Sequence, residues 1–295
     1  MLGRYGKDAG SLLGVEIAAD SVRMLQLQRR HGRRKVAAWA REPLHSPLCD
    51  DWSRNAQPVI AALRSAYARS GSTCRQVAVA LPGTQVICKV CRLPAGLTTD
   101  QIEAQLLSDA QRLFPFPLED LAMDFQVLGP SLAPGCQVDV LVAACRQRSV
   151  ELLEQLFEEA GLQTVALEVD SIALRRVLPA GQRLLRVESG AASLHTWTGQ
   201  GLPQRHDLQF APVDSAEQRV ERVARLLDDT VDPEQGVLVA VASETAAGWI
   251  EGLTQRLTVP CEALAPWPGV AAGGQGMPEG CAAMALACGL AMGEG

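Results

Sequence analysis

One segment, residues 101–146, constrains the fold of this chain more than any other part. Its first part, residues 101–113, repeats apolar residues at helical spacing and predicts an amphipathic helix. Pro115 and Pro117 end this helix, because proline lacks a backbone N–H and biases the preceding residue toward an extended conformation. Two strands are predicted next, at residues 123–128 and 138–144. The second is almost entirely apolar, as expected of a strand that is covered on both faces.

The rest of the chain also alternates strands and helices, which predicts an α/β protein. Strands are predicted at residues 12–18, 22–28, 35–41, 76–81, 84–93, 163–167, 183–188, 193–197, 203–210 and 237–242. Helices are predicted at residues 58–68, 148–160, 170–177, 215–227, 245–257 and 278–292, with a loop at residues 260–276. With 295 residues, of which 47% are hydrophobic, the chain is long enough to form two lobes.

Three motifs carry a resemblance to a known family: F-P-F-P-L-E at residues 114–119, D-F at residues 124–125 and V-D-V-L-V-A-A-C-R at residues 138–146. In this order and spacing they resemble the type IV pilus assembly protein PilM family, whose members are similar in fold to the actin-like cell-division protein FtsA. The resemblance implies an actin-like (ribonuclease H-like) fold with two lobes, residues 1–178 and 179–295, and a subdomain inserted in the first lobe at about residues 84–132. The second lobe should be reduced, because the segment between Phe210 and Ser215 is short where the family has a longer stretch.

The resemblance also implies a nucleotide site between two strand hairpins. The first hairpin is GVEIAADSVRMLQL, residues 14–27, and its candidate site residues are Gly14, Glu16 and Ser21. The second is V-E-S-G-A-A-S, residues 187–193, with Glu188 and Gly190. An ATP site of this kind needs small residues that let backbone N–H groups approach phosphate oxygens, and carboxylates that hold magnesium.

The chain departs from this pattern at several positions. Glu16 and Glu188 stand where the family has Asp, and the extra methylene crowds an octahedral magnesium site. Ala18 and Ala19 stand where the family has hydroxylated residues, and the expected adenosine loop at residues 243–247 has no Gly pair. We therefore expect a degenerate site with weak or no ATP binding, no other cofactor or metal, and no useful hydrolysis. Two alternatives stay open: an ATP-binding switch that uses magnesium, and a first hairpin that binds no ligand.

In the family, a groove between the first lobe and its inserted subdomain binds the cytoplasmic N-terminal peptide of a PilN-like inner-membrane protein. The best-matching motifs would line this groove, so the resemblance nominates Phe114, Phe116, Leu118, Asp124 and Arg146. An apolar groove with a few polar contacts suits a peptide. Core packing is the alternative role for the two phenylalanines. The resemblance thus implies a pilus-assembly scaffold, or the equivalent component of a mannose-sensitive haemagglutinin (MSHA) pilus, a DNA-uptake apparatus or a type II secretion system.

Charge and hydropathy argue against several other functions. The net charge of -6 gives no nucleic-acid footprint. No apolar run approaches the roughly 20 residues that cross a bilayer, so we expect a cytoplasmic protein that reaches the inner membrane through its partner. Cys88 and Cys91 lie three apart in a predicted strand, point to opposite faces and are expected to be structural. His195 shares a strand face with Trp197 and is expected to pack, and no catalytic constellation is present.

The sequence R-R-H-G-R-R-K at residues 29–35 forms a basic turn. One interpretation is a solvated hairpin tip. The others are a contact with an acidic partner, for which the assembly motor ATPases are candidates, or with anionic lipid headgroups.

Overall fold

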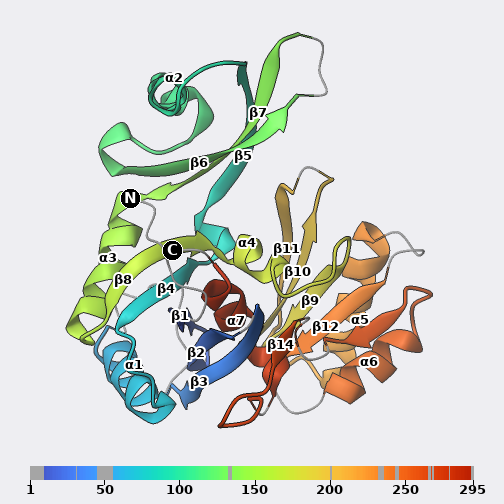
Figure 1. The fold of residues 1–295 in the computed structure, drawn as a ribbon. Coiled ribbons are helices and arrows are strands. Elements are labelled where there is room, and N and C mark those ends of the chain that lie inside the picture. Colours follow the sequence, from blue (N-terminus) through green and yellow to red (C-terminus); the bar gives the residue numbers. More distant parts are fainter. Residues whose placement is uncertain are drawn as a thin grey trace.

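The computed structural model describes residues 10–30, 32–44, 56–131, 135–199, 201–231, 236–242, 246–264, 267, 269–278 and 280–293. These residues form three β-sheets with helices between and around them (Figure 1). Two sheets form the two lobes, and the third forms the subdomain at the top of Figure 1. The α/β class predicted from the sequence is confirmed.

The first sheet has six strands in the order β14-β3-β2-β1-β4-β8. They are β1 (Gly10–Ile17), β2 (Ser21–Arg30), β3 (Arg33–Pro43), β4 (Gln76–Leu81), β8 (Gln163–Val169) and β14 (Val270–Ala271). The first three strands form an antiparallel meander. β4 pairs in parallel with β1, and β8 pairs in parallel with β4.

Helices cover both faces of the first sheet. On one face, α1 (Ala56–Ser70) and α3 (Gln147–Glu159) share a buried core with alternate residues of β1, including Leu13 and Val15. On the other face, α7 (Ala285–Ala291), the 3₁₀ turn η4 (Cys281–Met284) and α4 (Asp170–Arg175) form a second core. That core also takes in residues of the second sheet, so α7 lies between the two lobes (Figure 1).

Gly14 lets α7 approach β1 closely. A Cβ atom built at this position would lie 2.0 Å from the carbonyl oxygen of Ala287 and 2.8 Å from the backbone nitrogen of Ala291. α7 packs on the first sheet and β14 is one of its strands, although both lie within residues 179–295, the range expected for the second lobe. Local periodicity predicts a helix but does not say which sheet it covers.

The second sheet has the strand order β11-β10-β9-β12-β13. Its strands are β9 (Arg183–Val187), β10 (Ala191–Trp197), β11 (Pro203–Gln209), β12 (Val237–Val241) and β13 (Cys261–Ala263). α5 (Ala216–Thr230) and α6 (Ala246–Thr254) belong to this lobe, and α5 packs on one face of the sheet. A short turn links β11 to α5, where the backbone N–H of Ala211 donates to the carboxylate of Asp214 (2.7 Å).

The third sheet joins β5 (Ile87–Pro94), β6 (Leu121–Pro130) and β7 (Gln137–Arg146) in the order β5-β7-β6, all antiparallel. α2 (Thr99–Leu113) covers one face, where Ile102 and Leu106 pack with Val140 and Val142 of the central strand. Thr98 and Gln101 form the capping box that begins this helix. Because β7 is the central strand, the sheet extends beyond residue 132, the expected end of the inserted subdomain.

Three segments differ from the predicted elements. The strand expected at residues 84–93 begins only at Ile87, because Gly83–Gln85 forms a 3₁₀ turn (η2). The loop expected at residues 260–276 contains the short strands β13 and β14. Within the helix expected at residues 278–292, the structure has a 3₁₀ turn followed by α7. Strands of two or three residues are too short to show an alternating pattern. Their positions depend instead on pairing with distant parts of the chain.

Candidate functional site

The two hairpins nominated from the sequence meet between the lobes. Glu16 lies near the end of β1, directly opposite Arg23 on β2. Glu188 follows β9 at the start of the second hairpin, two residues after Arg186. The side chains of these four residues contact one another across the interlobe boundary. The structure thus brings the two predicted acidic residues together.

Arg23 is the centre of this cluster. Its side chain is fully buried, with 0% exposure. The guanidinium donates to both oxygens of Glu188, at 3.1 Å (Nη1–Oε1) and 2.9 Å (Nη2–Oε2). It also lies 3.0 Å from Oδ1 of Asp20 and 3.5 Å from Oε2 of Glu16, and it donates to the carbonyl oxygen of Ala283 (3.1 Å). The side chain of Arg23 therefore links β2 to the second lobe and to the 3₁₀ turn η4, which precedes α7.

Arg186 links the same two glutamates from the second lobe. Its Nη2 lies 2.5 Å from Oε1 of Glu16 and 3.0 Å from Oε1 of Glu188. Glu16 and Arg186 are largely buried, with 6% and 11% of their side chains exposed. Each glutamate therefore contacts two guanidinium groups, one from each lobe.

Asp20, Ser21 and Arg41 complete the network at its outer edge. Ser21 is buried, donates to Asp20 (2.7 Å) and accepts from Nε of Arg23 (3.1 Å). Arg41, on β3, donates to Oδ2 of Asp20 (3.1 Å) and to the carbonyl oxygen of Ala242 (3.1 Å), which follows β12. The cluster therefore contains three carboxylates and three guanidinium groups.

Within this network, the electrostatics favour the charged form of every group whose pKa is shifted. Burial acts to raise the pKa of Glu188, but the hydrogen bonds from Arg23 and the charge of Arg186 outweigh it and leave this pKa below its usual value. The pKa of Asp20 is lowered in the same way, against its burial, by Ser21 and Arg23. Burial acts to lower the pKa of Arg23, but the charges of Glu16 and Glu188 raise it. The network is thus a set of mutually neutralised ions.

This arrangement has a chemical consequence for nucleotide binding. Magnesium in phosphate sites is held by carboxylates together with phosphate oxygens. Here the carboxylates of Glu16 and Glu188 already contact Arg23 and Arg186. Within the ranges that the structure describes, no group of three or more His, Cys, Asp or Glu side chains is placed to hold a metal ion. ATP with magnesium would therefore have to separate these ion pairs.

The other nominated nucleotide residues have separate positions. Gly14 lies under α7, and its lack of a side chain lets the backbone of this helix approach β1. Gly190 is exposed in the second hairpin with open space around it, and its carbonyl oxygen accepts from the backbone N–H of Phe210 (2.9 Å). Residues 243–245, in the expected adenosine loop, lie outside the described residues.

The site residues predicted from the sequence did not include Arg23, Asp20, Arg41 or Arg186, although Asp20 and Arg23 lie within the first predicted hairpin. One signal was available for Arg186, because it lies two residues before Glu188 in a strand-like run. Arg41 could not be found in this way, because its contacts span 21 residues to Asp20 and 201 residues to Ala242.

The residues nominated for partner binding do not form one surface. Phe114 is buried in the core beneath α2. Phe116 is half-buried, and the guanidinium of Arg146 lies 5.3 Å above its ring while also pairing with Asp120 (3.0 Å). Leu118 is 46% exposed. The core-packing alternative therefore describes Phe114, whereas Phe116 and Arg146 contact each other at the edge of this core.

Asp124 lies on the other face of the third sheet. Its neighbours Met123 and Phe125 pack toward α2, and successive residues of a strand point to opposite faces. Asp124 is exposed, and its carboxylate accepts from the backbone N–H of Phe125 (2.8 Å). A single bound peptide could therefore not contact all five nominated residues from one side of the sheet.

A second buried polar cluster links α4 to the second sheet. The hydroxyl of Ser171 lies 2.8 Å from Nδ1 of His195, and Trp197 Nε1 donates to the carbonyl oxygen of Ser171 (3.0 Å). Asp170 forms an ion pair with Arg205. His195 is 1% exposed, and burial followed by the charge of Arg205 lowers its pKa well below the usual value. His195 is therefore a neutral packing residue.

Cys88 and Cys91 point to opposite faces of the third sheet. Cys91 packs in the core beneath α2, whereas Cys88 lies on the other face. Burial, with the charge of Asp170, raises the pKa of Cys88 to about 11. Its thiol therefore stays protonated near neutral pH.

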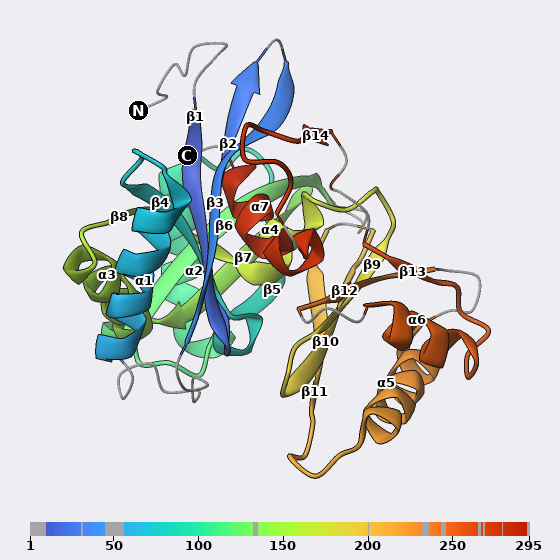
Figure 2. The ribbon, with the colours of Figure 1, turned by 90° about the horizontal axis from the view of Figure 1, so that it is seen from below.

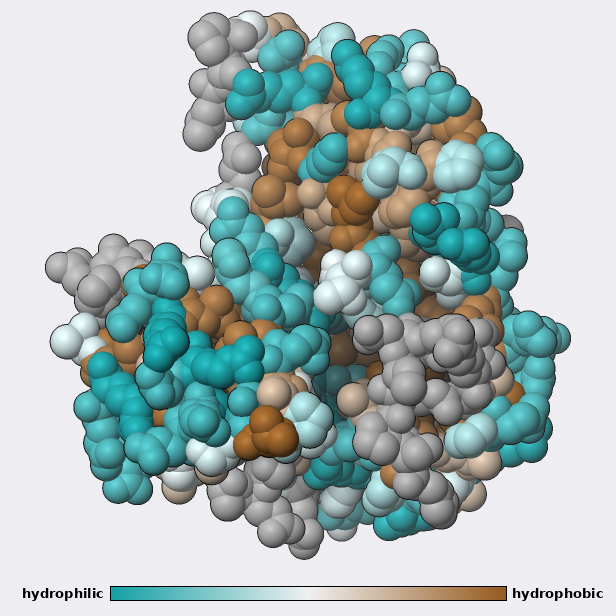
Figure 3. Space-filling view, turned by 180° about the vertical axis from the view of Figure 1, so that it is seen from behind, coloured by the Kyte–Doolittle hydropathy of each residue, from teal (hydrophilic) through white to brown (hydrophobic). Residues whose placement is uncertain are grey.

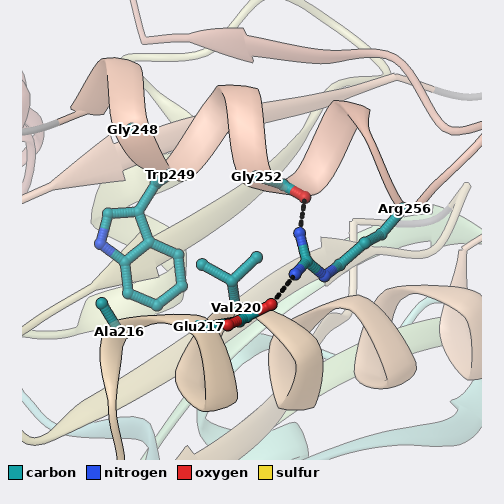
Figure 4. Close-up of a pocket in the computed structure, with 7 residues that line it drawn as sticks. All are labelled: Ala216, Glu217, Val220, Gly248, Trp249, Gly252 and Arg256. Carbon is teal, nitrogen blue, oxygen red and sulfur yellow. Dashed lines mark hydrogen bonds and ion pairs between the residues drawn. The ribbon is translucent and has the colours of Figure 1, made fainter.

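A shallow cavity of about 310 Å³ lies between α5 and α6, away from the two hairpins (Figure 4). Its lining residues are Ala216, Glu217, Val220, Gly248, Trp249, Gly252 and Arg256. Trp249 and Val220 point into it, and the ion pair of Glu217 with Arg256 (3.1 Å) closes one end (Figure 4). None of these residues belongs to the ion-pair network.

Two sheets whose first hairpins face each other, with a helix between them and a subdomain inserted in the first lobe, define an actin-like α/β protein. The sequence profile of the family described as "Type IV pilus assembly protein PilM" matches residues 14–193. The chain belongs to this family.

Solved structures share the fold at low sequence identity. The "PilM-PilN type IV pilus biogenesis complex" contains a chain 21% identical with a TM-score of 0.74, covering 96% of this chain and 98% of that one. The ethanolamine utilization protein EutJ from Carboxydothermus hydrogenoformans is 13% identical with a TM-score of 0.56, covering 96% and 89%. The cytoplasmic domain of EpsL, an inner membrane component of the type II secretion system of Vibrio cholerae, is 13% identical with a TM-score of 0.51, covering 96% and 95%.

Among the helices that the structure describes, none is both long and apolar enough to span a membrane.

Proposed function

We propose that this chain is a non-catalytic scaffold of a type IV pilus assembly machine and that its ATP site has been replaced by an internal ion-pair network. The observation that carries the proposal is the position of Arg23 and Arg186 between Glu16 and Glu188. Removing one partner of a buried ion pair is strongly unfavourable, because the remaining charge stays buried without compensation. Binding of ATP with magnesium would incur this cost at both glutamates.

The proposed ligand is the cytoplasmic N-terminal peptide of a PilN-like inner-membrane protein, which would hold the scaffold at the membrane. Family membership supports this choice, as does the similarity to a structure of a PilM–PilN complex. Seen from behind, hydrophobic surface gathers over the inserted subdomain (Figure 3). Among the described residues, three of the five large hydrophobic side chains with high exposure belong to residues 84–132: Leu107, Leu118 and Val127.

On the α2 side of this subdomain, three side chains offer a mixed surface for a peptide. Phe116 gives an aromatic ring, Arg146 holds a cation over that ring, and Leu118 adds an exposed apolar group. An apolar surface with one or two charged groups can bind a peptide and fix its direction. We place the peptide contact at these three residues and leave out Phe114, which is buried, and Asp124, which lies on the opposite face.

The test is isothermal titration calorimetry of the purified chain with ATP plus magnesium, and separately with a synthetic peptide from the cytoplasmic start of the PilN-like partner. The expected result is peptide binding without ATP binding. Leu118→Ser should weaken the peptide, whereas the matched variant Val213→Ser should not, because Val213 is 89% exposed on the second lobe. Micromolar ATP binding would contradict the replaced site and favour a nucleotide-dependent switch.

A further outcome concerns the partner. The PilN-like peptide could show no binding while the corresponding peptide of a type II secretion, DNA-uptake or MSHA pilus partner binds. That result would support a scaffold role in the system whose peptide binds. If no peptide binds, or if both serine variants weaken binding equally, the proposed contact surface is wrong.

A further inference from the structure

The hairpin between β2 and β3 concentrates positive charge in a way that the proposed function does not use. Five cationic residues occur within seven positions: Arg29, Arg30, Arg33, Arg34 and Lys35. Among the described residues, β1 does not extend along this part of the hairpin, because its first residue, Gly10, lies opposite Gln28. Beyond that point β2 and β3 continue as a hairpin that projects from the body of the protein (Figure 2), and β14 pairs with the outer edge of β3 at Arg34 and Lys35.

The strand register places like charges directly opposite each other. Arg29 faces Arg34, and Arg30 faces Arg33. Like charges at opposite positions of an antiparallel pair destabilise the pairing. Within the described part of the chain, none of Arg29, Arg33, Arg34 and Lys35 forms an ion pair with a carboxylate. The five basic residues at the tip of this hairpin therefore lower the stability of the local strand pairing.

Both faces of the hairpin are cationic. Arg33 and Lys35 are exposed and lie two residues apart, so they share one face. Arg34 lies between them, is half-buried and points to the other face, where its cross-strand partner Arg29 is exposed. A flat acidic patch on a protein would meet only one of these faces. A layer of anionic headgroups would surround the tip and contact both.

We propose that this hairpin binds the anionic headgroups of a lipid bilayer, tip first. Residues 28–35, Q-R-R-H-G-R-R-K, include no large apolar side chain that could enter the acyl region, so the contact is electrostatic. The chain as a whole carries a net charge of -6, and the rest of its surface is therefore repelled by the same membrane. This difference in charge orients the protein with the β2–β3 hairpin toward the lipid.

The size of the effect follows from the number of basic residues at the surface. Each Lys or Arg near an anionic leaflet strengthens binding about fivefold, and the attraction decays within a Debye length. The double variant Arg29→Gln/Arg33→Gln should therefore bind anionic vesicles about 25-fold more weakly than the parent chain. Both residues are exposed, and their replacement relieves two like-charge pairs, so the variant should be at least as stable as the parent.

The experiment is co-sedimentation of the full chain with vesicles of phosphatidylcholine containing phosphatidylglycerol, and with vesicles of phosphatidylcholine alone, in low and high salt. The matched control is Arg112→Gln/Arg225→Gln, which removes the same charge from two exposed arginines on α2 and α5. Thermal unfolding of both double variants checks that the fold is retained.

The proposal predicts binding only to the anionic vesicles, its loss in high salt and its loss in the hairpin variant but not in the control. Absence of binding to anionic vesicles, or equal weakening by both double variants, would overturn it. Retention of the chain on polyglutamate or DNA without binding to vesicles would also overturn it, and would assign the hairpin to an acidic macromolecule.

Discussion

Replacing Arg23 by methionine tests the central claim about the interlobe network. Arg23→Met keeps a long apolar stem but removes the guanidinium that contacts Glu188, Asp20 and Glu16. The three carboxylates then depend on the remaining arginines. We expect the variant to fold but to lose a large part of its stability.

The magnitude follows from the contacts that are left. Loss of one partner of a buried ion pair costs about 3–5 kcal/mol. After the change Glu188 and Glu16 keep Arg186, and Asp20 keeps Arg41, so no carboxylate is left without a cation. We therefore expect the free energy of unfolding to fall by about 3 kcal/mol, at the lower end of this range. With a urea m-value of about 3 kcal/mol/M for a chain of this size, the midpoint of unfolding should fall by about 1 M.

The assay is urea unfolding at pH 7, followed by circular dichroism. The control is Arg41→Met, because Arg41 is 35% exposed and forms one ion pair with Asp20. This change should cost about 1 kcal/mol or less. If Arg23→Met is no more destabilising than Arg41→Met, then Arg23 does not hold the lobes together, and the argument for a replaced nucleotide site loses its physical basis.

Three further predictions concern packing and pH. Gly14→Ala should destabilise the protein severely, because the new methyl group would overlap the backbone of α7, whereas Gly190→Ala should be nearly neutral; thermal unfolding compares the two. Because the pKa of Glu188 is lower in the folded state than its usual value of 4.5, stability should fall as the pH drops through and below that value, and Glu188→Gln should flatten this dependence in acid titrations of the urea midpoint. Because the folded state lowers the pKa of His195 below 6.5, the unfolded chain takes up its proton more readily, so stability should also fall between pH 7 and pH 5, and a His195→Gln variant that keeps the full slope would refute this.

Much of the fold could be predicted from local patterns. The helical spacing at residues 101–113 and the apolar run at residues 138–144 correspond to α2 and β7, because each follows from periodicity within one segment. The two-residue strand β14 could not be found, since it pairs with β3, more than 200 residues earlier. The position of α7 on the first sheet could not be predicted for the same reason, because it depends on contacts between segments that are far apart in the sequence.

The candidate site was predicted only in part, for a related reason. Glu16 and Glu188 were found because the family pattern marks their hairpins, and the substitution of Glu for Asp was visible in the sequence. Their ion pairs with Arg186 and Arg23 join residues 170 and 165 positions apart. Gly14 shows that one residue type can meet two needs, since a glycine that suits a phosphate loop also suits the close approach of a helix.

The placement of α7 has a consequence for synthesis on the ribosome. The face of the first sheet that carries Leu12, Leu25 and Leu27 is covered in the finished protein by Ala285–Ala291. About 200 residues separate β4 from α7, and translation at about 5–20 residues per second needs about 10–40 s to reach it. Until α7 has emerged, the part of this apolar face that α7 covers in the finished protein stays exposed on the nascent chain, and we expect it to favour binding of ribosome-associated chaperones.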